Sequence, residues 1–194
     1  MAVHHNQRHE RLNLEEYFEL LAKDPEHAYE YLDGDIYMMM GDSPDHAIIT
    51  ANILSLLKNL LRGSGCIVYS SDVYVRLSEK HRVCPDVTVS CDPRDRMAED
   101  ALSYPRLVVE VLSPATEARD RGQKALQYRA CPSVQEYLLV SSNAQIVELV
   151  RREKNGFWLL QTLGAGDSLE LTSVGGRLPV ADIYEDTSLV LAQE

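Results

Sequence analysis

Positive charge is scarce in this sequence. Its 194 residues include 19 lysines and arginines against 30 aspartates and glutamates, which gives a formal net charge of -11. Diffuse electrostatics will therefore repel nucleic acid, and any polyanion has to be held by a local basic patch or through metal ions. This balance is evidence against a histone-like or non-specific DNA coat. It still permits a metal-dependent nuclease, because the site of such an enzyme is itself acidic.

Cysteine is also rare. The four cysteines are Cys66, Cys84, Cys91 and Cys131. None forms a C-x-x-C pair, and no histidine cluster lies near them at zinc spacing. We therefore expect isolated thiols in a reducing compartment.

Long apolar runs are absent as well. No run approaches the length of a membrane span, and the first ten residues lack the apolar core of a signal peptide. A soluble, cytoplasmic protein that does not bind membranes is expected. Apolar residues make up 45% of the chain and charged residues 25%, values typical of globular proteins. We expect a flexible N-terminus over residues 1–12 and a single domain over residues 13–194.

Turn signals and apolar periodicity predict alternating helices and strands. Asn13 is a good N-cap for a short helix, and the two-residue turn Asp33-Gly34 predicts a β-hairpin. Pro44 opens a helical pattern that runs to about Leu61. Further strands are predicted over 66–77, 83–89, 107–112, 135–140, 145–151, 157–161 and 168–171, a loop or short helix over 92–104, a helix from Ser113-Pro114 to about Ala130, and a closing segment over 180–184. This order predicts a mixed α/β fold with one central sheet flanked by helices.

Two carboxylates occur inside apolar, β-prone segments: Asp86 in Pro85–Val89 and Glu110 in Leu107–Leu112. A lone charge in such a segment is costly unless it is paired, hydrogen-bonded or bound to metal. If the two strands are neighbours, the two carboxylates converge, and such a pair suits Mg²⁺ or Mn²⁺. Two separate structural carboxylates, each satisfied by the backbone or by arginine, explain the spacing equally well.

The helix after Glu110 carries Asp120, Lys124 and Tyr128 at intervals of four residues, so they share one helical face. Lys124 could point back toward the carboxylates, where an ammonium would stabilise charge on a phosphate or orient a hydroxide. The alternative is an exposed Asp120–Lys124 pair that contributes ~0.3–0.5 kcal/mol to helix stability.

Several motifs follow one another in a recognisable order. They are Tyr-Glu-Tyr-Leu-Asp-Gly at 29–34, His46 at a helix start, Pro85-Asp86-Val87, Val109–Pro114, Asp120–Lys124, Tyr128 and Val134–Tyr137. This order resembles the Uma-two family of the PD-(D/E)XK restriction endonuclease-like superfamily. The resemblance extends from about Leu14 to Tyr184.

The resemblance implies a sheet flanked by helices and Mg²⁺-dependent hydrolysis of phosphodiester bonds. Asp86 matches the first aspartate of the superfamily motif, Glu110 matches its second carboxylate, and Glu30 matches an upstream acidic residue. The lysine of the motif would lie two residues after Glu110, but Leu112 occupies that position. The resemblance suggests that Lys124 is a relocated lysine.

We therefore interpret the sequence as a metal-dependent endonuclease acting on DNA, with Asp86, Glu110, Lys124 and Glu30 in the catalytic site and Mg²⁺ or Mn²⁺ held by Asp86 and Glu110. The residues expected to bind substrate are His46, Arg121 and Tyr128. A homodimer is expected, because pairing two clefts helps an acidic protein to hold a long polyanion. Two alternatives stay open: an inactive nuclease-fold module for binding or assembly, and a phosphoesterase for small nucleotides.

Overall fold

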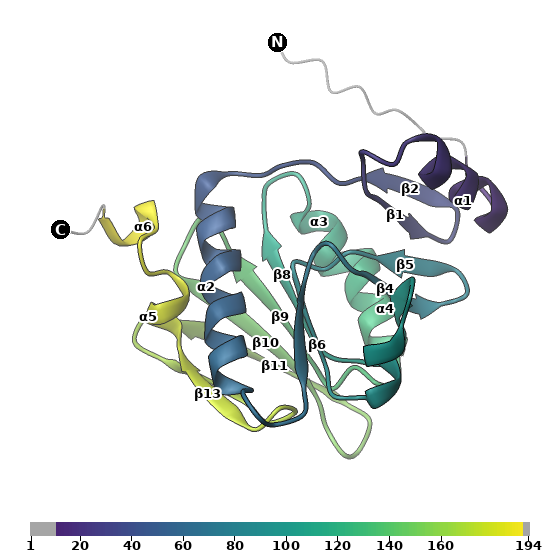
Figure 1. Ribbon diagram of the computed structural model, residues 1–194. Helices are drawn as coiled ribbons and strands as arrows, with labels where there is room; N and C mark the ends of the chain where they lie inside the picture. Colours follow the sequence, from purple (N-terminus) through teal and green to yellow (C-terminus); the bar gives the residue numbers. More distant parts are fainter. Residues whose placement is uncertain (1–10, 192–194) are drawn as a thin grey trace, which may run out of the picture.

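The computed structural model of the chain describes residues 11–191 and contains three sheets (Figure 1). The largest sheet has six strands in the order β11-β10-β9-β8-β6-β3, and a five-stranded sheet has the order β2-β1-β5-β4-β7. The strands β12 and β13 form a two-stranded sheet. The mixed α/β class is therefore confirmed, although the strands divide among three sheets where one was expected.

The N-terminal part forms as its local signals predict. Helix α1 (Leu14–Lys23) begins at Asn13, whose side chain accepts a hydrogen bond from the backbone of Glu16. Strands β1 (Tyr29–Leu32) and β2 (Asp35–Met38) pair antiparallel across the Asp33-Gly34 turn. The predicted flexible N-terminus lies outside the described residues over 1–10, whereas the backbone N–H of Leu12 bonds to the carbonyl of Gly34 at 2.9 Å.

The six-stranded sheet has one parallel pair at its centre. Strand β8 (Pro105–Leu112) lies parallel to β9 (Glu136–Ser141), and the other neighbours are antiparallel. The remaining strands of this sheet are β3 (Ile67–Ser70), β6 (Val87–Ser90), β10 (Ile146–Arg152) and β11 (Trp158–Gly164). Because β8 is covered on both faces, it is almost entirely apolar, as the sequence indicated.

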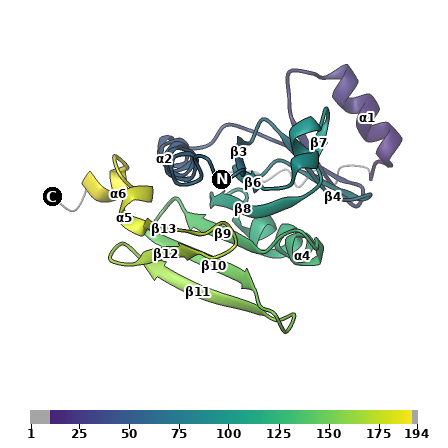
Figure 2. The ribbon, with the colours of Figure 1, turned by 60° about the horizontal axis from the view of Figure 1, so that its bottom comes forward.

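Two apolar layers cover this sheet. Helix α2 (Pro44–Leu60) packs on one face together with β12 (Ser168–Leu171), β13 (Gly176–Pro179) and α5 (Val180–Ile183). Figure 2 shows the β12–β13 hairpin beside β10, with β11 at the outer edge. Helix α4 (Ala125–Ala130) packs on the other face through Ala125 and Tyr128. Helix α6 (Ser188–Leu191) follows near the end of the chain.

Two strand predictions have wrong boundaries. The expected strand 66–77 is divided into β3 and β4 (Tyr74–Ser78). The expected strand 83–89 is divided into β5 (His81–Val83) and β6, which belong to different sheets. The closing segment 180–184 is the helix α5, and the segment 92–104 contains the short helix η1 (Pro93–Met97) and the strand β7 (Ala101–Leu102).

The helix expected from Ser113 begins later and is irregular. The carbonyl of Ser113 accepts bonds from the N–H groups of Thr116 and Glu117, which makes residues 113–116 a turn. The helix then consists of α3 (Glu117–Arg119), the π-helical turn η2 (Asp120–Lys124) and α4. Single π-turns inside helices occur frequently at functional sites.

The expectation of four isolated thiols is wrong. Cys66 and Cys91 form a disulfide, whereas Cys84 and Cys131 are free and buried. The cause is strand register: Ile67 pairs with Ser90 in the β3–β6 ladder, so one step further brings Cys66 opposite Cys91. The expectation of a reducing compartment was based on isolated thiols, so the disulfide removes its basis. In the described part of the chain, no helix combines the length and the apolar character required to cross a membrane.

Reducing the disulfide is expected to lower the free energy of unfolding by about 3 kcal/mol, because a cross-link closing a loop of this length restricts the unfolded chain. Urea denaturation of the wild type with and without dithiothreitol measures this effect, and a Cys66→Ser/Cys91→Ser variant controls for the reductant. If the midpoint of the wild type is the same under both conditions, the disulfide does not form in solution.

Candidate active site

The register of the β6–β8 ladder brings the two motif carboxylates to one place. Val87 pairs with Val109, so the next step along the two strands sets Asp86 opposite Glu110. Asp86 itself lies in the bend before β6, not within a strand as expected. Its Oδ2 atom accepts a hydrogen bond of 2.7 Å from the backbone N–H of Val111. Both carboxylates line the same cleft, which has a volume of about 630 Å³.

Lys124 reaches this position from the π-helical turn η2. Its Nζ atom lies 2.6 Å from Oε1 of Glu110 and 2.9 Å from Oε1 of Glu30. A third contact of 3.4 Å joins it to Asp120. The exposed Asp120–Lys124 pair is therefore not what forms, because both side chains are buried. The two short contacts engage two of the three N–H bonds of the ammonium, whereas Oδ1 of Asp120 is near enough for an ion pair but accepts no hydrogen bond.

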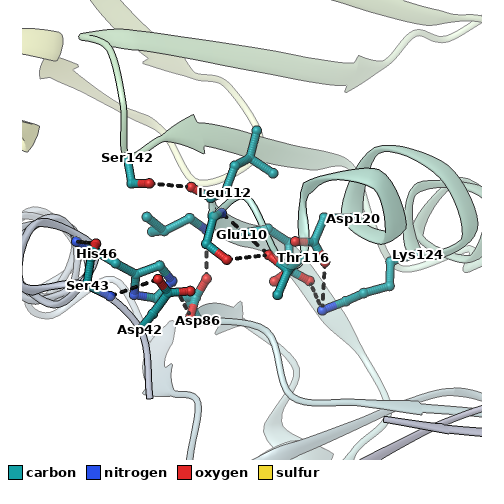
Figure 3. Close-up of polar contacts among 12 residues, drawn as sticks. Asp42, Ser43, His46, Asp86, Glu110, Leu112, Thr116, Asp120, Lys124 and Ser142 are labelled. Atoms are coloured by element: carbon teal, nitrogen blue, oxygen red, sulfur yellow. Dashed lines mark hydrogen bonds and ion pairs between the residues drawn. The ribbon is translucent and has the colours of Figure 1, made fainter. Parts of the chain in front are cut away.

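Leu112 does not take part in this arrangement. It is buried in the apolar core beneath α4. The lysine that contacts Glu110 therefore comes from the helical segment η2 and not from strand β8. Figure 3 shows Asp86 and His46 on one side of Glu110, with Asp120 and Lys124 on the other.

Burial and charge change the protonation of the cluster. Burial lowers the pKa of Lys124, but Glu110, Glu30 and Asp120 more than offset this and hold that pKa well above the ordinary value of 10.5. Burial raises the pKa of Glu110 well above 4.5; Lys124 opposes the rise, and Asp120, Asp86 and Glu30 add to it. The lysine is therefore charged, while Glu110 keeps a proton to a higher pH than an ordinary glutamate.

This raised pKa has a consequence for stability. A group whose pKa is raised in the folded state contributes stability below its unfolded pKa and loses that contribution as pH rises through the folded value. In EDTA, the wild type is expected to lose stability relative to Glu110→Gln as the pH rises from 4.5, the ordinary value for glutamate. Urea denaturation of both proteins across the pH range measures the difference. A difference that stays constant with pH would contradict the raised pKa.

The N-terminus of α2 forms the opposite wall of the cleft. Nε2 of His46 lies 3.5 Å from Oδ1 of Asp86, and both side chains are largely buried. Burial lowers the pKa of His46, but hydrogen bonding and charge from Asp86 give a net rise above 6.5. Asp42 also lines the cleft, and its side chain accepts a bond of 2.8 Å from the N–H of Ser43. His46 is thus close to the carboxylates, as a substrate-binding role requires.

The cleft does not include all the predicted site residues. Glu30 was predicted as a catalytic residue, but it does not line the cleft: it is fully buried beneath Lys124 and accepts a bond of 3.0 Å from the N–H of Cys84. Tyr128 is buried too, and its hydroxyl donates a hydrogen bond to Oε1 of Glu110. It supports Glu110 from below and does not reach the cleft surface. The predicted substrate contact of Tyr128 therefore does not fit its position.

Arg121 also lies away from the cleft. Its guanidinium pairs with Glu117 at 2.7 Å and with Glu148 at 2.6 Å. Arg119, two residues earlier, does line the cleft and packs over the ring of Tyr37 with 4.4 Å to the centroid. The sequence pattern selected Arg121, and it did not indicate that Arg119 is the arginine that lines the cleft.

Asp42 and Asp120 also line the cleft, although the sequence did not predict either of them as a site residue. Asp42 directly precedes Ser43, the N-cap of α2, and loop carboxylates beside a helix start are common for structural reasons alone. For Asp120 the available signal was its four-residue spacing from Lys124. The Oδ1 atom of Asp120 and the Oε2 atom of Glu30 are buried and make no hydrogen bond within the described part of the chain.

Free carboxylate oxygens are the feature that suits a divalent cation. The contacts of Glu110 with Lys124 and Tyr128 all use Oε1, which leaves Oε2 for a ligand. Within residues 11–191 there is no group of three or more His, Cys, Asp and Glu side chains placed to hold a metal ion. Mg²⁺ is ordinarily held through one or two carboxylates and keeps several waters, so Asp86 and Glu110 form a compatible pair.

Proteins with similar sequences are known. The model of the Uma2 family, described as a putative restriction endonuclease, matches residues 14–181. An uncharacterized protein from Synechocystis sp. is 42% identical over 175 residues, which cover 90% of this chain and 92% of the relative. A second uncharacterized Synechocystis protein is 30% identical over 145 residues, covering 73% and 81% respectively.

The fold of the chain is similar to that of a solved structure. The crystal structure of a putative nuclease belonging to DUF820, from Anabaena variabilis, matches with a TM-score of 0.74 at 19% identity, over 89% of this chain and 97% of that one. The fold is therefore of the restriction endonuclease-like α/β class, as expected. The chain belongs to the Uma2 family, which confirms the resemblance inferred from its motifs.

Proposed function

We propose that the chain is a metal-dependent endonuclease that hydrolyses phosphodiester bonds of DNA. The observation that carries the proposal is the contact between the buried Lys124 ammonium and Glu110, in a cleft that Asp86 also lines. The family description and the nuclease-like structural match support a nuclease in general terms. The cleft residues support the finer statement, because they combine two carboxylates with a fixed positive charge.

Asp86 and Glu110 would hold Mg²⁺ or Mn²⁺. A divalent ion bound there supplies a contact for the scissile phosphate and a bound water with a lowered pKa. The protein fixes the two carboxylates: the N–H of Val111 holds Asp86, and Lys124 and Tyr128 hold Glu110. Lys124 therefore acts as a positioning residue, and its charge also stabilises negative charge that develops near the cleft.

Two other side chains complete the proposed substrate site. His46 lies against Asp86 and faces the cleft from the first turn of α2. Arg119 lines the cleft, and its Nη2 atom lies 3.6 Å from Oε2 of the buried Glu30. Arginine is well suited to bind phosphate oxygens through paired N–H groups. We propose Arg119 for the phosphate contact in place of Arg121.

A cleavage assay tests the proposal and its alternative substrates. Supercoiled DNA, linear duplex and short dinucleotides are incubated with wild type in Mg²⁺, in Mn²⁺ and in EDTA. The proposal expects metal-dependent cleavage of DNA that is lost in Asp86→Asn and kept in Asp182→Asn, whose exposed carboxylate lies outside the cleft. Cleavage of dinucleotides alone would favour a phosphoesterase for small nucleotides.

An inactive nuclease-fold module is the second candidate. The net charge of -11 and the core position of Leu112 favour it, since neither helps to hold or cleave a polyanion. This candidate expects no cleavage with any metal while DNA or a protein partner still binds. Metal-dependent cleavage that disappears in Asp86→Asn would exclude it.

A homodimer and a cytoplasmic location also stay proposals. Support for self-association comes from β11, an edge strand without charged residues whose Leu159 and Leu160 are exposed. Natural edge strands are ordinarily protected by charges, proline or bulges, so an uncharged edge is suited to pairing with a second copy. Sedimentation at micromolar concentration should give a dimer, and a purely monomeric profile would refute it.

A further inference from the structure

A second cavity lies near the start of β8, whereas the candidate active site lies near its end. It has a volume of about 700 Å³ and is lined by fourteen residues. Four of them are arginines, Arg94, Arg106, Arg151 and Arg152, and we call this site the arginine cavity. In a chain of net charge -11, four guanidinium groups around one cavity are a local reversal of charge.

Two of these arginines are neutralised by carboxylates. Arg94 binds Asp92 through Nε at 2.9 Å and through Nη2 at 2.6 Å. Arg151 binds Glu136 at 2.6 Å. Glu136 is fully buried, and its oxygens also accept bonds from the backbone N–H and hydroxyl groups of Thr172 and Ser173. Its charge is thus already balanced and shielded, and the cavity is left with the charges of the other two arginines.

Arg106 and Arg152 have no carboxylate partner within the described residues. Among residues 11–191, Arg152 donates only to carbonyl groups, those of Val134 at 2.9 Å, Arg129 at 2.9 Å and Cys131 at 2.8 Å. Arg106 is exposed, and its contact with the protein is a long bond of 3.4 Å to the carbonyl of Ser173. Carbonyl groups orient a guanidinium without cancelling its charge.

We propose that the arginine cavity binds a phosphate group. The exposed Arg106 can offer a phosphate paired N–H bonds. Arg152 adds positive charge beside it, because its Nε and Nη2 groups already donate to carbonyls and its guanidinium lies 4.5 Å from the centroid of Trp158. The guanidinium of Arg94 lies 3.5 Å from the centroid of the Tyr104 ring, and the two stacked groups form a flat part of the cavity wall. The ligand class is a phosphate-bearing compound, either a free nucleotide or a phosphate of a nucleic-acid strand. The inference does not depend on the proposed nuclease activity.

Calorimetric titration of the full chain in EDTA tests this site, because EDTA suppresses metal-bridged phosphate binding between Asp86 and Glu110. The probes are inorganic pyrophosphate, a 5′-phosphorylated dinucleotide and a short DNA duplex. Saturable binding of at least one probe is expected, and Arg106→Gln should weaken it at least tenfold. Arg177→Gln, which removes an exposed arginine outside the cavity, should bind as tightly as wild type.

The outcomes separate the possible sources of the ligand. Binding of pyrophosphate or the dinucleotide identifies a free phosphate compound, whereas binding of the duplex alone identifies a nucleic-acid strand; both support the proposal. No binding of any probe overturns it, as does an Arg106→Gln variant that binds like wild type. A loss in Arg119→Gln as large as that in Arg106→Gln also overturns it, because the phosphate would then occupy the candidate active site.

Discussion

Replacing Lys124 by methionine is expected to reduce metal-dependent cleavage by about a hundredfold or more, the usual effect of removing a group aimed at developing charge. The same change should lower the free energy of unfolding by roughly 3–5 kcal/mol, because it leaves buried carboxylates without their partner. Glu110, Glu30 and Asp120 all lie within 3.4 Å of the ammonium. An exposed Asp120–Lys124 pair would leave folding nearly unchanged on this replacement, but both side chains are buried.

A double variant separates catalysis from stability. In Lys124→Met/Glu30→Gln one of the uncompensated carboxylates is neutral, so part of the lost stability should return. Cleavage should stay low, because the positive charge beside Glu110 is still absent. Mn²⁺ affinity should be kept or slightly increased, since a cation next to the metal site has been removed.

Lys80→Met is the matched control for cleavage, because Lys80 is exposed and forms a surface ion pair with Asp33. Rates are compared at a temperature at which each variant is folded. If Lys124→Met cleaves as fast as this control, or if the double variant regains cleavage together with stability, Lys124 has a structural role only.

Millimolar Mn²⁺ is expected to raise the melting temperature of the wild type markedly. A ligand that binds only the folded state at a hundred times its dissociation constant adds about 2.7 kcal/mol, which corresponds to roughly 5–10 °C for a chain of this size. The physical reason is that the metal neutralises carboxylates that are costly to keep together in the cleft. Asp86→Asn should show little or no rise, because one of the two ligands is lost.

Asp182→Asn is the control for the change of charge, since Asp182 is exposed on α5 and lies outside the cleft. It should gain as much melting temperature as the wild type. Equal shifts in all three proteins would show that Mn²⁺ binds elsewhere, and no shift in any of them would leave the cleft without a metal function.

The features that the sequence predicted well are set by local interactions. The cap at Asn13, the turn at Asp33-Gly34 and the helix start at Pro44 each depend on groups a few residues apart. Such signals can be read from the sequence because the same short segment contains both partners of the interaction.

The features that were missed depend on strand pairing. The run from Val83 to Val89 is apolar and β-prone throughout, but its first part pairs in one sheet and its last part in another. Composition does not encode the neighbour of a strand, so the break around Pro85 was not foreseen. The Cys66–Cys91 disulfide has the same origin, since only the β3–β6 register brings the two residues together.

The candidate site was predicted in part. The order of family motifs indicated Asp86, Glu110 and Lys124, and these residues do meet around one cleft. Burial could not be inferred from that order, so Glu30 and Tyr128 were expected at the surface although they lie beneath it. Choosing Arg119 instead of Arg121 required knowing how the π-helical turn orients its neighbours.

Calorimetric titration with Mn²⁺ tests the central claim most directly, because it detects the metal site without knowledge of the substrate. The wild type, Asp86→Asn and Asp182→Asn are titrated under the same conditions at a pH at which Glu110 can lose its proton. The account predicts saturable binding of Mn²⁺ to the wild type and to Asp182→Asn, and a loss of that binding in Asp86→Asn. Binding to Asp86→Asn with the affinity of the wild type, or no binding to the wild type, would contradict a metal site built on Asp86 and Glu110.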